Sequence, residues 1–149
     1  MTSAGPLSWR TGAGWIVLAG GGRSQADLWE ELDSAILGWA VPGRAIAAIV
    51  TAPEILADAE AALEAWAELG GSTGYVVDLS AQPDERSADN WELLAEAGLV
   101  YVAGGLSVAH LLDRLKATST LEAIELAFES GAPVVAASAA AETMGAWVD

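Results

Sequence analysis

Short runs of apolar residues recur along the chain, and each is followed by a segment with the periodicity of an amphipathic helix. The runs are continuous rather than alternating, which is typical of strands in a parallel sheet that is covered on both faces. Strand–helix alternation of this kind predicts a three-layer, doubly wound α/β domain with a five-stranded parallel sheet. We expect right-handed crossovers and the strand order 2-1-3-4-5. The predicted strands are Trp15–Ala19, Ile46–Val50, Tyr75–Leu79, Leu99–Ala103 and Val134–Ala136.

Capping signals delimit the helices between these runs. The spacing of Thr51 and Glu54 is that of a capping box, with a proline early in the first turn. This helix is predicted to stop at Gly70-Gly71, and the last helix before the fifth strand is predicted to stop at Gly131. The apolar face expected on the first of these two helices consists of Ile55, Leu56, Ala59, Leu63 and Trp66.

The length of 149 residues fits one domain. Residues 1–13 are predicted to form a loose N-terminal arm, and residues 14–149 a single α/β domain. The N-terminus lacks a basic segment followed by an apolar one, so we expect no signal peptide and a cytoplasmic location. The longest apolar runs, such as Leu99–Ala103, are too short to span a membrane.

The charge of the chain limits the classes of partner that it can bind. The net charge is −15, from 21 acidic and 6 basic residues, and such a surface repels phosphate backbones and anionic membranes. We therefore expect neither nucleic acid nor a membrane as a partner. The absence of cysteine excludes disulfides and sulfur-ligated metals, and we expect no cofactor. The seven tryptophans suggest a packed core and an oligomer interface, so a homo-oligomer, at least a dimer, is expected.

A glycine-rich segment, Gly20-Gly21-Gly22, lies between the first strand and the first helix. Backbone N–H groups at such a turn can hold a phosphate or carboxylate. The segment matches neither the dinucleotide-binding pattern, because Gln25 occupies the third glycine position, nor a P-loop. A tight strand-to-helix turn is the more common role, and an anion-binding loop is the alternative.

Ser138 is the sharpest candidate for chemistry. It follows the fifth apolar run in the segment Ala136–Ala140, and a serine between small residues at a strand end has the size pattern of a nucleophile elbow. The backbone N–H of Ala139 would then face an oxyanion, together with an amide of Gly104-Gly105 from the neighbouring strand end. The alternative is a small residue that fills a tight turn.

The only histidine, His110, lies about one turn into the helix expected after the fourth strand. With no second histidine, no His-based metal site is expected. A packed or surface role is more common than a base for a histidine of this kind. It is nevertheless the one candidate base for Ser138, with Asp113 as the orienting carboxylate one turn further on.

These segments together resemble the peptidase E and cyanophycinase family of serine hydrolases, which have the class I glutamine amidotransferase-like fold. The resemblance runs from Trp15 through "LVYVAGGLSVAHLLDRLKATSTLEAIELAFESGAPVVAASAAA" and places Gly104-Gly105 and Ser138-Ala139 on the family's glycine loop and elbow. It implies a serine hydrolase acting on small acidic peptides. Departures are Ala136 and Ala140 at the elbow glycines and Leu106-Ser107 after the glycine pair.

The family's catalytic histidine and acid lie downstream of the serine, whereas Asp149 comes eleven residues after Ser138. Removing triad members lowers rates by factors of about 10⁴ to 10⁶. The first hypothesis is therefore a shortened peptidase E-like domain with little or no hydrolase activity. The second is a minimal or fragmentary active serine dipeptidase that uses Ser138. The third is a flavodoxin-like domain that binds a small anion or nucleotide at Gly20–Gly22.

Overall fold

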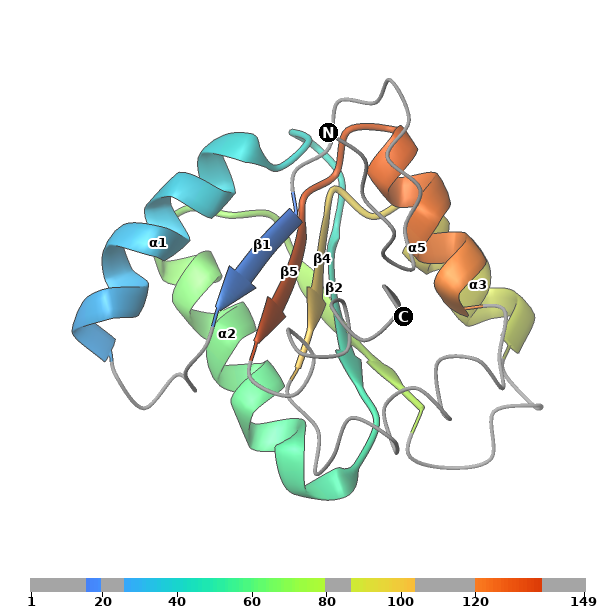
Figure 1. Ribbon diagram of the computed structural model, residues 1–149, viewed down its shortest axis with the longest axis horizontal. Helices are drawn as coiled ribbons and strands as arrows, with labels where there is room; N and C mark the ends of the chain where they lie inside the picture. Colours follow the sequence, from blue (N-terminus) through green and yellow to red (C-terminus); the bar gives the residue numbers. More distant parts are fainter. Residues whose placement is uncertain (1–15, 20–25, 80–86, 104–119, 138–149) are drawn as a thin grey trace, which may run out of the picture.

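The computed structural model describes residues 16–19, 26–79, 87–103 and 120–137 of the chain. Within these ranges parallel strands alternate with helices, and the helices lie on both faces of one sheet (Figure 1). The predicted parallel α/β sheet is thus confirmed. The elements are β1 (Ile16–Ala19), α1 (Ala26–Trp39), β2 (Ile46–Val50), the 3-10 turn η1 (Pro53–Ile55), α2 (Leu56–Glu68), β3 (Gly74–Asp78), α3 (Ser87–Ala95), β4 (Leu99–Val102), α5 (Thr120–Glu129) and β5 (Val134–Ala137).

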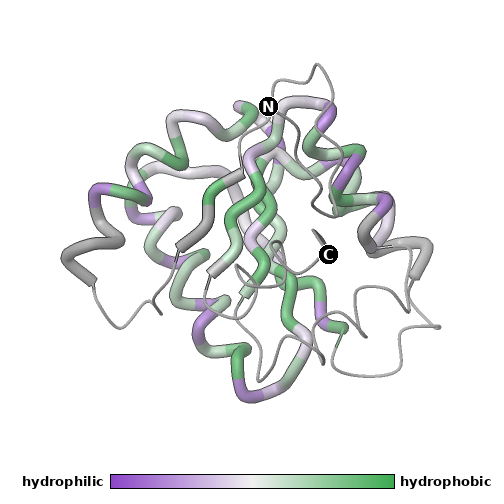
Figure 2. The backbone as a smooth tube through the Cα atoms, in the orientation of Figure 1, coloured by the Kyte–Doolittle hydropathy of each residue, from purple (hydrophilic) through white to green (hydrophobic). Residues whose placement is uncertain are grey.

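Two apolar layers hold the helices on the sheet, because successive strand residues point to opposite faces. On β2, Ile46, Ala48 and Val50 pack in the layer that contains α1 and α2. Ala47 and Ile49 pack in the layer that contains α3 and α5. The central strands are mostly apolar, as Figure 2 shows, since both faces are covered. Helix residues buried in the two layers are Ile36, Ala59, Ala62 and Trp66 on one face and Leu94, Ala123, Ile124, Ala127 and Phe128 on the other.

The strand order differs from the predicted 2-1-3-4-5. The described sheet has the order β1-β5-β4-β2-β3. Of the predicted neighbour pairs, the described sheet has that of β4 with β5; β2, predicted at one end of the sheet, lies between β3 and β4, and β3 lies at an end. β1, predicted between β2 and β3, pairs with β5 at the other end of the sheet.

The physical reason for this shift lies in β5. Val134, Val135 and Ala136 are completely buried, and such a strand needs a neighbour on both sides. β4 pairs with one side of β5 and β1 with the other. The connection from β1 to β2 must then pass over two intervening strands, and α1 is the helix of this connection that packs on the sheet.

The capping-box prediction at Thr51 is wrong. The residue that caps the first turn is Ala52, with no side-chain hydrogen bond, and the turn is the short 3-10 segment η1 with its proline at the start. Leu56, predicted on the buried face, is 37% exposed. The stop signals hold: Gly70 and Gly131 have φ angles of 90° and 107° just after α2 and α5, a conformation that glycine adopts without strain.

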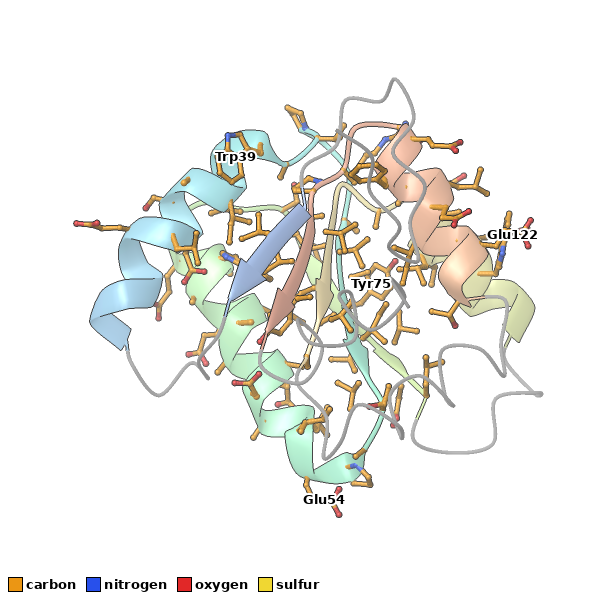
Figure 3. All side chains as sticks on the ribbon, viewed as in Figure 1. Trp39, Glu54, Tyr75 and Glu122 are labelled. Atoms are coloured by element: carbon orange, nitrogen blue, oxygen red, sulfur yellow. The ribbon has the colours of Figure 1, made fainter. Side chains whose placement is uncertain are left out.

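Trp66 is fully buried, which confirms the expectation that tryptophan contributes to the core. Trp39, at the end of α1, is 38% exposed (Figure 3). In the described part of the chain, no helix has the length and apolar character needed to cross a membrane.

Candidate functional site

The carboxyl ends of the described strands meet at one edge of the sheet, because all the strands are parallel. Val102 of β4 is paired with Ala136 of β5, and Ala19 of β1 is paired with Ala137. Counting along the chain, Gly104 and Ser138 each come two residues after a member of the first pair. The prediction that the fourth and fifth strands are neighbours, on which the combination of these two residues depends, is therefore confirmed.

A topological switch point lies between β2 and β4 at this edge. The chain leaves β2 toward α2 on one face, whereas α5, the next described helix after β4, packs on the other face. Ligands of open α/β sheets bind in the crevice that such a reversal opens. Thr51 and Ala52 after β2 and Ala103 after β4 are buried there, and the N–H of Ala103 donates to the carbonyl of Ile49 at 3.1 Å.

The candidate catalytic and binding residues lie outside the described residues and stay predictions. They are Ser138, His110, Gly104, Gly105 and Ala139, together with Gly20, Gly21 and Gly22 of the anion-binding alternative. The strand before Gly20–Gly22, β1, lies at one end of the described sheet, with β5 and β4 between it and β2. A loop after β1 is thus separated from the switch point by two strands, which is unfavourable for the flavodoxin-like alternative.

Beneath this edge, a buried polar cluster joins two helices to the sheet. The indole Nε1 of Trp66 donates to Oδ1 of Asp33 at 2.9 Å, and Asp33 is only 2% exposed. The hydroxyl of Tyr101 on β4 donates to Oδ2 of Asp58 at 2.8 Å. The two aromatic rings meet edge to face, with centroids 5.4 Å apart and an interplanar angle of 84°. This cluster fixes β4, whose carboxyl end leads into the Gly104-Gly105 segment.

Sequence reasoning missed this cluster. Asp33 and Trp66 are 33 residues apart, and Asp58 and Tyr101 are 43 residues apart, so no local spacing indicates the pairs. The signal that was present is general: a buried tryptophan or tyrosine needs a partner for its polar atom. An acidic residue on the apolar face of α1 was the natural candidate for that partner.

Tyr75 on β3 is the one described side chain whose pKa is clearly shifted from its ordinary value. Its hydroxyl is buried and has no hydrogen-bond partner among the described residues. Burial raises the pKa of Tyr75 to about 12, and the nearby Glu96 carboxylate acts in the same direction. The ring lies between the sheet and the α3–α5 layer (Figure 3), so it serves packing rather than proton transfer near neutral pH.

The described residues contain no cluster of three or more histidine, cysteine or acidic side chains placed to hold a metal ion. The described residues that follow the strands at this edge include the buried Thr51, Ala52 and Ala103. Backbone amides at strand ends and helix starts of parallel α/β sheets can bind a carbonyl oxygen or another small anion.

No protein-family model and no curated protein sequence matches the chain. A match among solved structures is the crystal structure of a peptidase from an acI-B1 Actinobacterium, with a TM-score of 0.69 at 20% sequence identity. The likeness covers 86% of this chain but 55% of the peptidase, so the chain spans about half the length of that protein. The chain therefore shares its fold with part of that protein.

Proposed function

We propose that this chain is a serine hydrolase-type domain of the peptidase E and cyanophycinase kind, with the class I glutamine amidotransferase-like fold, and that the isolated chain has little or no peptidase activity. The observation that carries the proposal is the β4–β5 pairing. It brings the strand ends before Gly104-Gly105 and before Ser138 next to each other. The fold likeness to a solved peptidase supports the same assignment.

The proposed chemistry assigns a role to each residue at the edge. The hydroxyl oxygen of Ser138 would attack the carbonyl carbon of a small acidic peptide. The N–H of Ala139 and an amide of Gly104-Gly105 would stabilise the negative charge that develops on the carbonyl oxygen. The hydroxyl proton must pass to a base, and His110 is the only histidine of the 149 residues. An unaided serine hydroxyl is a poor nucleophile at neutral pH.

The low activity follows from the demands on that base. His110 would have to come within about 2.6–3.2 Å of the Ser138 hydroxyl and also be held by a carboxylate such as Asp113. The family's own base is a histidine downstream of the elbow, and the 149 residues contain none there. A site that binds an acyl group without a positioned base retains binding but little turnover.

The test is incubation of the purified chain with Asp-Xaa dipeptides and, separately, with a fluorophosphonate probe. Ser138→Ala is the test variant. Ser130→Ala is a matched control, since Ser130 is exposed and its hydroxyl donates only to the nearby Leu126 carbonyl among the described contacts, at 2.9 Å. We expect neither turnover nor labelling above the Ser138→Ala background. Turnover that is lost in Ser138→Ala and kept in Ser130→Ala would establish the alternative, an active serine dipeptidase.

A further inference from the structure

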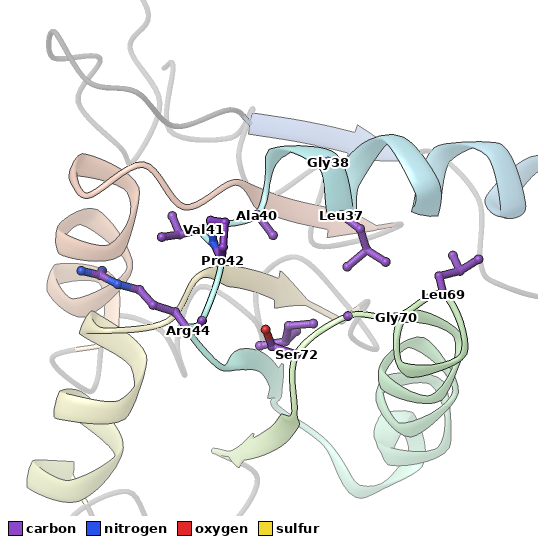
Figure 4. A pocket seen from close by; sticks show the side chains of 12 residues that line it. Leu37, Gly38, Ala40, Val41, Pro42, Arg44, Leu69, Gly70 and Ser72 are labelled. Carbon is purple, nitrogen blue, oxygen red and sulfur yellow. The ribbon is translucent and has the colours of Figure 1, made fainter.

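A hollow of about 480 Å³ opens at the amino edge of the sheet, opposite the candidate site (Figure 4). The end of α1, the loop before β2 and the loop between α2 and β3 form its walls. We call it the amino-edge hollow. Its volume falls in the range of about 300–1,000 Å³ that is typical of ligand pockets. Its lining includes Leu37, Val41, Pro42, Ile46, Leu69 and Ser72, with several glycines between them.

The walls of the hollow are polar and apolar in nearly equal parts, and exposed apolar surface lies next to them. Leu69 is 45% exposed, and Trp39, next in sequence to the lining residues Gly38 and Ala40, is 38% exposed. Arg44 also contributes to the lining, but Figure 4 shows its side chain pointing away from Leu37 and Leu69. The hollow thus has apolar side chains, from Leu37, Val41 and Leu69, against which an apolar group can pack, and the Arg44 side chain does not point toward Leu37 and Leu69.

Gly38 leaves space for a bound molecule at the wall of the hollow. It lies in the last turn of α1, and a Cβ atom built on it would meet nothing within 4 Å. Gly43 and Gly70, which also line the hollow, have φ angles of 79° and 90°. Side chains rarely adopt this backbone conformation, so glycine is required at those two positions. Neither backbone conformation nor packing among the described residues requires glycine at 38. Its bare backbone permits close approach by another molecule.

Among the described residues near the hollow, acidic side chains outnumber the one basic side chain, Arg44. Glu60, Glu64 and Glu68 are exposed on α2 at a spacing of four residues, so they form a stripe on one face of the helix that ends beside Leu69. Both α1 and α2 end at the hollow, and helix C-termini carry partial negative charge. Arg44 is the one basic residue in the described part of the chain. An occupant with positive charge beside its apolar group is therefore favoured.

We propose that the amino-edge hollow docks a basic amphipathic polypeptide segment. An apolar side chain of the segment enters against Gly38 and Leu69, and its lysine or arginine residues face the stripe of Glu60, Glu64 and Glu68. A second copy of this chain fits less well, because two chains of net charge −15 repel each other. The proposal is independent of the chemistry at the opposite edge of the sheet.

The probe is a labelled synthetic amphipathic Leu/Lys peptide, titrated with the full chain and followed by fluorescence anisotropy at low and moderate salt. Gly38→Leu adds a large apolar side chain to the wall of the hollow, whereas Gly38→Ala, the matched control, adds a single methyl group. We expect Gly38→Leu to weaken binding by about tenfold or more, as expected when a central anchor site is blocked. Gly38→Ala should change the affinity by less than about twofold. Exchanging Glu60, Glu64 and Glu68 for glutamine should weaken binding and flatten its salt dependence.

Two further peptides separate the two parts of the proposal. A Ser/Lys peptide of equal charge lacks the apolar anchor and should bind weakly and equally to wild type and Gly38→Leu. A Leu/Glu peptide of the same pattern should not bind. Equal affinity of the Leu/Lys peptide for wild type and Gly38→Leu would overturn the proposal, as would its failure to bind at low salt. Concentration-dependent dimers in sedimentation that are lost in Gly38→Leu would also overturn it, in favour of a second copy.

Discussion

Trp66→Phe probes the bond that joins α2 to α1 through Asp33. The substitution removes the indole N–H that donates to Oδ1 of Asp33 at 2.9 Å and leaves a carboxylate that is 2% exposed without this donor. A phenyl ring retains much of the edge-to-face contact with Tyr101. The variant therefore isolates the hydrogen bond and a small loss of volume.

The expected cost can be worked from these two contributions. A hydrogen bond to a charged group contributes about 1.5–3 kcal/mol to stability. The smaller ring leaves a cavity of roughly 40 Å³, and at about 24 cal/mol per Å³ this adds about 1 kcal/mol. We expect Trp66→Phe to lower the free energy of unfolding by about 3 kcal/mol in total, a large share of the 5–15 kcal/mol typical of a domain.

The assay is urea unfolding followed by circular dichroism, applied to Trp66→Phe, Asp33→Ala and the double variant. The bond is already absent in either single variant, so the double variant should be less destabilised than the sum of the two by about 1.5–2 kcal/mol. The control is Trp39→Phe, at a position that is 38% exposed, which should cost less than about 1 kcal/mol. Additivity of the two single effects within about 0.5 kcal/mol would refute the assigned bond.

Three further expectations concern single substitutions. Gly98→Ala should destabilise the fold by about 2 kcal/mol in chemical denaturation, because its Cβ would lie 2.6 Å from the Val41 carbonyl oxygen; an unchanged midpoint would contradict this packing. Tyr101→Phe should cost about 1.5 kcal/mol by the same assay through loss of the bond to Asp58, and a stabilised variant would argue against that bond. Because burial raises the pKa of Tyr75 from 10.0 to about 12, the folded chain keeps a proton that the unfolded chain loses, so stability falls as pH rises through this window. Tyr75→Phe should reduce that slope in unfolding experiments at alkaline pH and remove an absorbance change at 295 nm near pH 12; an identical slope would contradict the assignment.

The apolar runs were sufficient to predict the strands and the layers, because burial on two faces leaves a strong mark on composition. Strand bounds shifted by a residue at most: β3 begins at Gly74 rather than Tyr75, and β4 ends at Val102 rather than Ala103. The position of β1 was not predictable in the same way. A run such as Ile16–Ala19 indicates a buried strand. The strand with which it pairs depends on which other strand has an unpaired edge, and the run itself does not show that.

The candidate site was predictable only as a placement of strand ends. The register between Val102 and Ala136 is determined by pairing across the sheet, which no local pattern records. The long-range partners of Trp66 and Tyr101 were missed for the same reason. The amino-edge hollow depends on the space between two loops, and Gly38 cannot be told from other helix-terminal glycines by sequence, because only the structure shows that a Cβ atom there would meet nothing within 4 Å. Association into a dimer stays a prediction that light scattering can test.

The pairing of β1 with β5 has a consequence for the order in which the molecule assembles. The ribosome releases β1 before any other described strand, yet its partner is translated last among them. The pairs Ile16–Val134 and Val17–Val135 therefore close the longest loop in the sheet, and contacts of such high contact order form late. The unit from β2 to β5 can collapse first, with α2, α3 and α5 already covering it. Docking of β1 is then the last step, and until it occurs β5 exposes an unpaired edge that chaperones or other nascent chains can engage.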